Sequence, residues 1–156
     1  MAQDPERIPL SENLGYVLKQ AQSALHSAMD AALRPLGLTV SQYSCLEQLN
    51  RVPDQTNAQL ARGTFVTAQS MNDVLRGLQR RGLVERPDTA PAGRARPTRL
   101  TVAGQAALDD ARQALTPVDQ IMDAIAGAPE NAHLVAGLQS IVAGLGPGAP
   151  DDSSDA

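Results

Sequence analysis

Hydrophobic residues recur every three or four positions along most of the chain, which predicts a mainly helical protein. The longest such pattern runs from Ser11 to Leu36, where Pro35 and Gly37 end it. A helix of about seven turns is longer than the core of a small domain requires, so its length indicates a partner helix. The same spacing predicts three shorter helices between residues 39 and 81: Thr39 to about Asn50, Asn57 to Arg62, and Ala68 to Arg81.

The ends of these helices carry recognisable signals. Thr56 and Thr67 are predicted N-caps, and Gly82 follows the third helix at the usual C-cap position. The segment between the second and third helices, residues 63–66, is predicted to be a tight turn. The stripe predicted to be buried on the last of the three helices consists of Met71, Val74, Leu75 and Leu78.

Two short strands are predicted after Gly82, at residues 83–86 and 98–101, with a proline- and arginine-rich loop between them. They would form a hairpin. The helical pattern then returns from Thr101 to Gly127, with a break or kink expected at Pro117. Pro129 is expected to open a last helix that ends near Leu145, and the polar, acidic residues 146–156 are expected to be disordered.

The fold class is therefore mainly α with a small β-hairpin. Composition agrees, because hydrophobic residues make up 42% of the chain but aromatic residues only 2%, namely Tyr16, Tyr43 and Phe65. Such a core must be built from aliphatic side chains and Met. No apolar run is long enough to span a membrane, and the first ten residues are too polar for a secretory signal. With a single cysteine, the chain is expected in the cytoplasm.

The charges are unevenly distributed along the chain. The formal net charge is −4, but the segment from Arg62 to Arg99 contains eight arginines and three acids, a net charge of +5. The rest of the chain carries five basic and fourteen acidic residues, a net charge of −9. This asymmetry indicates a face that binds a polyanion on an otherwise acidic protein.

A short helix, a tight turn, a longer helix and a basic hairpin together indicate a winged helix-turn-helix that binds double-stranded DNA. Asn and Gln can pair with adenine, Ser with a donor or an acceptor, and Arg with guanine or a phosphate. The backbone N–H groups at Thr56 and Asn57 are predicted to contact a phosphate, and arginines at the hairpin tip to enter the minor groove. The predicted DNA-binding residues are Thr56, Asn57, Thr67, Gln69, Ser70, Asn72, Arg76, Arg94 and Arg96.

The runs NAQLARGTFVTAQSMNDVLRGLQRRGLVERP and GRARPTRLTVAG resemble the MarR (multiple-antibiotic-resistance regulator) family of bacterial transcription factors. This resemblance implies a homodimeric regulator, expected to be a repressor, that binds a near-palindromic operator. It also implies an N-terminal arm and dimerisation helix (1–36), a DNA-binding domain (37–101), C-terminal dimerisation helices (102–145) and a tail (146–156). Arg94 matches the family's wing arginine. Ala92 stands where the family has an aspartate that ties the wing down, and Arg96 and Arg99 are expected to supply charge there without holding the geometry. Phe65 is expected to seal the turn against the core.

Members of the family also bind small aromatic acids or phenols. By this analogy, His26, Met29, Tyr43 and Glu47 are candidates to line an effector cleft, although His26 also fits a dimer interface or plain surface. Two alternatives stay open: a redox sensor acting through Cys45, and a winged-helix module that binds proteins instead of DNA. The cysteine and the two histidines lack the close spacing of a metal site, and no enzyme or cofactor signature is present.

Overall fold

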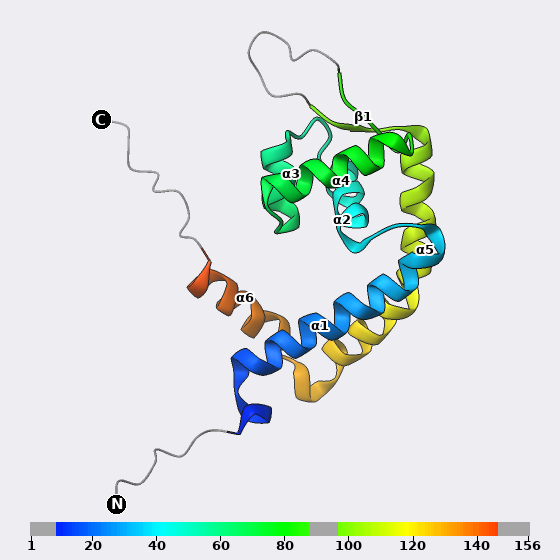
Figure 1. Ribbon diagram of the computed structural model, residues 1–156. Helices are drawn as coiled ribbons and strands as arrows, with labels where there is room; N and C mark the ends of the chain where they lie inside the picture. Colours follow the sequence, from blue (N-terminus) through cyan, green and yellow to red (C-terminus); the bar gives the residue numbers. More distant parts are fainter. Residues whose placement is uncertain (1–8, 88–96, 147–156) are drawn as a thin grey trace, which may run out of the picture. The chain divides into compact units, whose positions relative to one another are not determined.

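A computed structural model of the 156-residue chain describes residues 9–87 and 97–146. Within these ranges, helices dominate and two short strands form one small sheet (Figure 1). The chain divides into two compact units, residues 1–116 and 117–156. The helices are α1 (Leu14–Leu33), α2 (Val40–Arg51), α3 (Asn57–Thr64), α4 (Ala68–Arg80), α5 (Val102–Gly127) and α6 (Leu134–Leu145), and the strands are β1 (Val84–Glu85) and β2 (Arg99–Leu100).

Helix α1 begins three residues later than the sequence predicts. Residues 10–12 form a 3₁₀ turn, and Asn13 is the N-cap, because its side chain accepts a hydrogen bond from the Tyr16 N–H at 3.0 Å. Ser11 was therefore the wrong start. At the other end the helix tightens into a 3₁₀ turn over residues 34–36, and Gly37 adopts a left-handed backbone with φ of 66°. The predicted stop at Pro35 and Gly37 is confirmed.

Helices α2, α3 and α4 pack against one another and form the helix-turn-helix core (Figure 1). Thr39 and Thr56 each make a capping box with the glutamine three residues later, and Thr67 caps α4 through the Ser70 N–H. The predicted caps at Thr56 and Thr67 are confirmed. The fully buried side chains include Leu46, Leu60, Met71, Leu75 and Leu78. Val74, the fourth member of the predicted stripe, is only half-buried.

The turn between α3 and α4 differs from the prediction. Helix α3 continues through Gly63 and Thr64, so the turn is confined to Phe65 and Val66. Phe65 ends the helix with φ of 59°, a left-handed conformation that side-chain-bearing residues seldom adopt. Its side chain is 94% exposed. The expectation that Phe65 seals the turn against the core is therefore wrong.

Strands β1 and β2 pair antiparallel, with Val84 opposite Leu100 and Glu85 opposite Arg99, as the hairpin prediction requires. Thr101 joins this sheet to α5. Its hydroxyl donates to the Gly82 carbonyl at 2.6 Å and accepts from the Gly104 N–H at 3.0 Å. Gly104 is buried against β1, where a Cβ atom would lie 1.9 Å from the Leu83 carbonyl oxygen. Only glycine permits this approach of helix to strand.

Helix α5 is continuous through Pro117, so of the two predicted outcomes the break is wrong, while the kink stays a prediction. Proline lacks the N–H that would bond to the preceding turn. The carbonyl that Pro117 cannot bond is that of Gln113, four residues earlier; beside it, the Thr116 hydroxyl donates to the Arg112 carbonyl at 3.1 Å. The boundary between the two compact units falls at this proline.

The second unit, residues 117–156, contains the end of α5 and helix α6. Pro129 opens a 3₁₀ turn over residues 129–131, and α6 begins only at Leu134, five residues after the proline. This unit has large exposed apolar side chains, and α1 in the first unit has three more. They are Ile121, Met122, Ile125, Leu134, Val135, Leu138, Val142 and Leu145 in the second unit, and Leu14, Tyr16 and Val17 in α1. No helix in the described part of the chain combines the length and apolarity needed to cross a membrane.

Candidate nucleic-acid interface

Helix α4 presents a polar face to solvent opposite its buried stripe. Gln69, Ser70 and Arg76 are exposed on it, and Asn72 is half-buried at its margin. Asp73 lies one turn after Gln69, and its carboxylate is 4.0 Å from an Arg76 guanidinium nitrogen. Asp73 is not among the predicted DNA-binding residues, although its spacing from Gln69 places it on the same face. This face carries amide, hydroxyl, carboxylate and guanidinium groups, the set that reads base edges.

Thr67 has a structural task at the start of this face. Its hydroxyl accepts from the Ser70 N–H at 3.1 Å and donates to the Ser70 hydroxyl at 3.0 Å. Both residues are exposed, so the Ser70 hydroxyl keeps acceptor capacity toward solvent. Thr67 therefore orients the first turn of α4.

Some of the hydrogen-bonding groups at the start of α3 already have partners within the protein. The capping box occupies the N–H groups of Thr56 and Gln59, which leaves those of Asn57 and Ala58 for a phosphate. The Asn57 side chain donates to the Ala68 carbonyl at 3.2 Å, and this bond joins α3 to the beginning of α4. Asn57 was predicted as a DNA contact. The structure shows its amide fixing the geometry of the helix-turn-helix.

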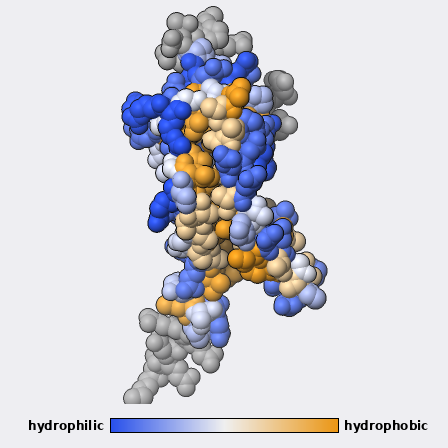
Figure 2. Space-filling view, turned by 90° about the vertical axis from the view of Figure 1, so that its right-hand side faces the viewer, coloured by the Kyte–Doolittle hydropathy of each residue, from blue (hydrophilic) through white to orange (hydrophobic). Residues whose placement is uncertain are grey.

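Two arginines of the basic segment make internal hydrogen bonds, and three others are exposed. Arg81 donates to the carbonyls of Gly37 and Leu36, at 2.7 and 3.1 Å, and so ties α4 to the α1–α2 connection. Arg99 is paired with Asp54. Arg62, Arg76 and Arg80 are exposed. Figure 2 shows hydrophilic side chains gathered at the height at which Figure 1 draws the helix-turn-helix. The charge asymmetry therefore overstates how many arginines are available to DNA.

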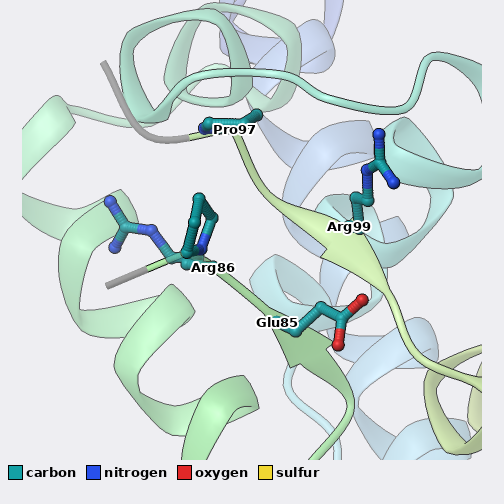
Figure 3. Close-up of a pocket in the computed structure, with 5 residues that line it drawn as sticks. Glu85, Arg86, Pro97 and Arg99 are labelled. Carbon is teal, nitrogen blue, oxygen red and sulfur yellow. The ribbon is translucent and has the colours of Figure 1, made fainter. Parts of the chain in front are cut away.

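The base of the wing is tied to the loop between α2 and α3. Arg99 donates from Nε and Nη2 to the two carboxylate oxygens of Asp54, the second bond at 3.0 Å. One residue earlier, the Thr98 N–H donates to the Gln55 carbonyl at 3.0 Å. Figure 3 shows the Arg99 side chain extending from β2 away from Glu85 of the paired strand. Arg99 therefore does hold geometry, contrary to the sequence-based expectation. Ala92, Arg94 and Arg96 lie outside the described residues.

The Asp54–Arg99 contact was missed because 45 residues separate its partners and neither has a distinctive local pattern. The neighbouring arginine lowers the pKa of the Asp54 carboxyl, chiefly through the hydrogen bond. Asp54 also has a left-handed backbone, with φ of 62°, which aspartate tolerates better than most residues.

The four candidate effector residues do not all line the same cavity. Tyr43 and Glu47 line a cavity of about 220 Å³ together with Arg51 and Phe65, whereas His26 and Met29 do not line it. Glu47 is mostly buried and receives two hydrogen bonds from Arg112 of α5, both at 3.0 Å. This pairing lowers the pKa of the Glu47 carboxyl. Its stabilising contribution is present at neutral pH and is lost as pH falls through that lowered value.

Cys45 is fully buried on α2, and desolvation raises the pKa of its thiol to about 12. The reactive form of cysteine is the thiolate, which is almost absent at neutral pH with such a pKa. This environment favours an inert core thiol over the redox alternative. In the described ranges, no cluster of three His, Cys, Asp or Glu residues that could hold a metal ion is found.

Comparison with known proteins gives consistent relatives. A model described as MarR family matches residues 36–95. The chain is 39% identical over 117 residues to the HTH-type transcriptional repressor Rv2887 of Mycobacterium tuberculosis, an alignment that covers 75% of this chain and 84% of that protein. The crystal structure of Rv2887 in complex with DNA superposes with a TM-score of 0.66 at 35% identity, covering 83% of this chain and 97% of the other.

Two further solved structures extend these relationships. The Rv2887 complex with salicylic acid has a TM-score of 0.65 at 35% identity and covers 90% of this chain and 99% of that one. The transcriptional repressor CouR bound to a 23-mer DNA duplex has a TM-score of 0.77 at 26% identity, with the same coverage of 90% and 99%. The fold is thus found in structures that contain DNA and in one that contains an aromatic acid.

Proposed function

The chain belongs to the MarR family of winged helix-turn-helix regulators, and from this premise we propose that it is a repressor that binds a near-palindromic operator as a homodimer. The observation that carries the proposal is the polar face of α4, held by the Thr67 cap and the Asn57–Ala68 bond. Repression would follow from occlusion of the promoter. A protein that acts on the chromosome of a bacterium works in the cytoplasm, where we place it.

The homodimer is supported by apolar side chains that the chain itself leaves uncovered. Helix α1 exposes Leu14, Tyr16 and Val17, and the second unit exposes eight further large apolar residues. Surfaces of this kind mark interaction sites. We therefore assign residues 1–36 and 102–145 to dimerisation and 37–101 to DNA binding. A two-fold dimer would place its two recognition helices about 34 Å apart, one turn of DNA.

The test of this function is binding to the DNA immediately upstream of the chain's own gene, measured by fluorescence anisotropy against a scrambled duplex of equal length. Sequence-specific binding by a dimer is the expected result. If the upstream and scrambled duplexes bind equally well, operator recognition is refuted. If neither binds, the alternative of a protein-interaction module gains support.

Base preference should depend on α4 and general affinity on the wing. Gln69→Ala and Asn72→Ala each remove an amide that can pair with adenine, and each should reduce discrimination by about 1–3 kcal/mol, roughly 5- to 150-fold. Arg94→Ala should weaken binding on all sequences by a similar factor while keeping the preferred site. The measurement is the affinity of each variant for a panel of operators with single base changes.

Gln79→Ala is a matched control for these variants, because Gln79 is an exposed amide near the other end of α4. It should leave the base preference intact. If the α4 variants and Arg94→Ala lower affinity equally on every sequence, the assignment of base readout to α4 is wrong.

We also propose that an aromatic acid of the salicylate type regulates the repressor from the cavity lined by Tyr43, Arg51 and Phe65. The chain has only three aromatic residues, and two of them line this cavity. Arg51 supplies a positive charge for a carboxylate, and its pairing with Glu47 is long, at 3.4 Å. Because Phe65 belongs to the turn before α4, a bound ring would alter the position of the recognition helix.

Replacing Phe65 should separate stability from regulation. Phe65→Gly removes left-handed strain of about 1–2 kcal/mol, offset in part by the chain entropy of glycine, so the protein should become more stable by about 1 kcal/mol. The same change removes one aromatic wall of the cavity, so salicylate should no longer release the operator. Chemical denaturation and anisotropy titrations measure the two effects.

Phe65→Ala is the control, because alanine removes the ring but keeps the strained backbone. It should lose the salicylate response without the gain in stability. A salicylate response that is unchanged in both variants would place the effector elsewhere, for example near His26 and Met29.

A further inference from the structure

The loop between α2 and α3, residues 52–55, contacts both the helix-turn-helix and the wing. The Gln55 side chain donates to the carbonyls of Gln48 and Val52, at 3.0 and 2.8 Å, which fixes the loop to the end of α2. The Gln55 carbonyl accepts from Thr98, and Asp54 accepts two bonds from Arg99. Gln55 therefore forms an isolated antiparallel bridge with Thr98, the residue just before β2.

The same loop leads directly into α3. Thr56, the residue after Gln55, is the N-cap of that helix. In this family α3 and α4 form the helix-turn-helix and the hairpin forms the wing, so the loop lies between the two parts expected to meet DNA. The four residues of this loop, 52–55, connect to both the wing and α3.

The two sets of contacts in this loop differ in character. Gln55 and Thr98 are buried, so their bond belongs to the folded core. The side chains of Asp54 and Arg99 are 43% and 63% exposed, and exposed ion pairs add little to folding stability. Their geometry is nevertheless bidentate, which restricts direction as well as distance. Such a pair is suited to setting the orientation of a strand that is already folded.

We propose that Asp54 and Arg99 form a clasp that positions the wing relative to the helix-turn-helix, so that both can engage DNA at once. The proposal rests on the proposed DNA-binding function. It assigns to Asp54 the task that the family gives to an aspartate inside the wing, where this chain has Ala92. Arg99 is then a positioning residue and not a phosphate contact.

The clasp and simple electrostatics predict opposite results for one variant. Asp54→Ala removes a negative charge near the DNA-binding surface, so electrostatics alone predicts tighter binding. The clasp predicts weaker binding, by about tenfold, because the wing loses its orientation. Glu85→Ala is the matched control, since Glu85 lies opposite Arg99 on β1 and acts on Arg99 only by a Coulombic attraction weaker than that of Asp54. It should bind DNA as tightly as the wild type, or more tightly.

The pair is tested further by a double-mutant cycle on operator affinity. Arg99→Ala should weaken binding in the wild-type background and have little effect once Asp54 is alanine. All variants should keep the wild-type melting temperature within about 2 °C, because the pair is exposed. Tighter binding by Asp54→Ala, or additive effects of the two substitutions, would overturn the clasp.

A measurement without DNA separates this proposal from the DNA-binding function. In the free protein, the Thr98 amide should exchange its hydrogen faster in Asp54→Ala than in the wild type or in Glu85→Ala. If the wild type binds no operator, the proposed function fails, while faster exchange at Thr98 still supports the clasp. Unchanged exchange at Thr98 would contradict it.

Discussion

Raising the salt concentration from 50 to 200 mM is expected to weaken binding of this repressor to its operator by about 10³-fold or more. The estimate follows from the arginines that remain available after internal pairing. Arg62, Arg76 and Arg80 are exposed, and the contact of Arg76 with Asp73 is long at 4.0 Å, so the proposed dimer offers about six phosphate contacts before the wing is counted. Each contact releases condensed counterions, and added salt opposes that release.

Single substitutions should show how much each of these arginines contributes to the salt dependence of DNA binding. Arg80→Ala should lower the slope of log affinity against log salt by about two per dimer, because each protomer loses one contact. Arg34→Ala is the control, since Arg34 lies just after α1 and pairs with Asp30 at 2.6 Å. Its slope should match the wild type. Affinity that is independent of salt in the wild type would contradict DNA binding through this face.

Gly104→Ala is expected to destabilise the protein more than any other small substitution considered. Alanine is the better helix former, so propensity alone predicts a gain of about 1 kcal/mol. The added Cβ would, however, meet the Leu83 carbonyl oxygen at 1.9 Å, a distance that requires α5 and β1 to separate. Overpacking of this kind costs about 2–3 kcal/mol, and the melting temperature should fall by about 5–10 °C.

Gly137→Ala is the matched control. Gly137 lies inside α6, and a Cβ atom there would meet nothing within 4 Å in the same chain. Its melting temperature should stay constant or rise. If Gly104→Ala melts at the wild-type temperature, the close approach of α5 to β1 does not exist in solution.

The parts of the fold that the sequence predicts are those with local causes. Thr56 and Thr67 cap helices through hydrogen bonds to residues three positions away, so a short stretch of sequence contains the whole signal. The hairpin strands and the buried stripe of α4 likewise follow from nearby residues. The α4 residues predicted to read DNA are exposed or half-buried for the same reason, and their role in reading DNA stays a prediction.

The features that the sequence did not predict depend on contacts between residues far apart in the chain, or on steric constraints. Asn57 and Arg81 have a structural role that the sequence did not predict, because each donates to a backbone carbonyl that becomes available only when the helices pack. The Asp54–Arg99 pair spans 45 residues. Phe65 was placed in the core because aromatic residues are usually buried, but α3 extends far enough to turn this one outward.

The burial of Cys45 makes it practical to label this repressor with a dye and follow its conformational changes. The chain has no other cysteine, and this one is inaccessible and deprotonates only near pH 12. A cysteine introduced on the exposed face of α4, for example at Gln79, would therefore be the only thiol that a maleimide dye reaches in the folded protein. One dye on each protomer would report the separation of the two recognition helices directly, with and without salicylate, in an otherwise native protein.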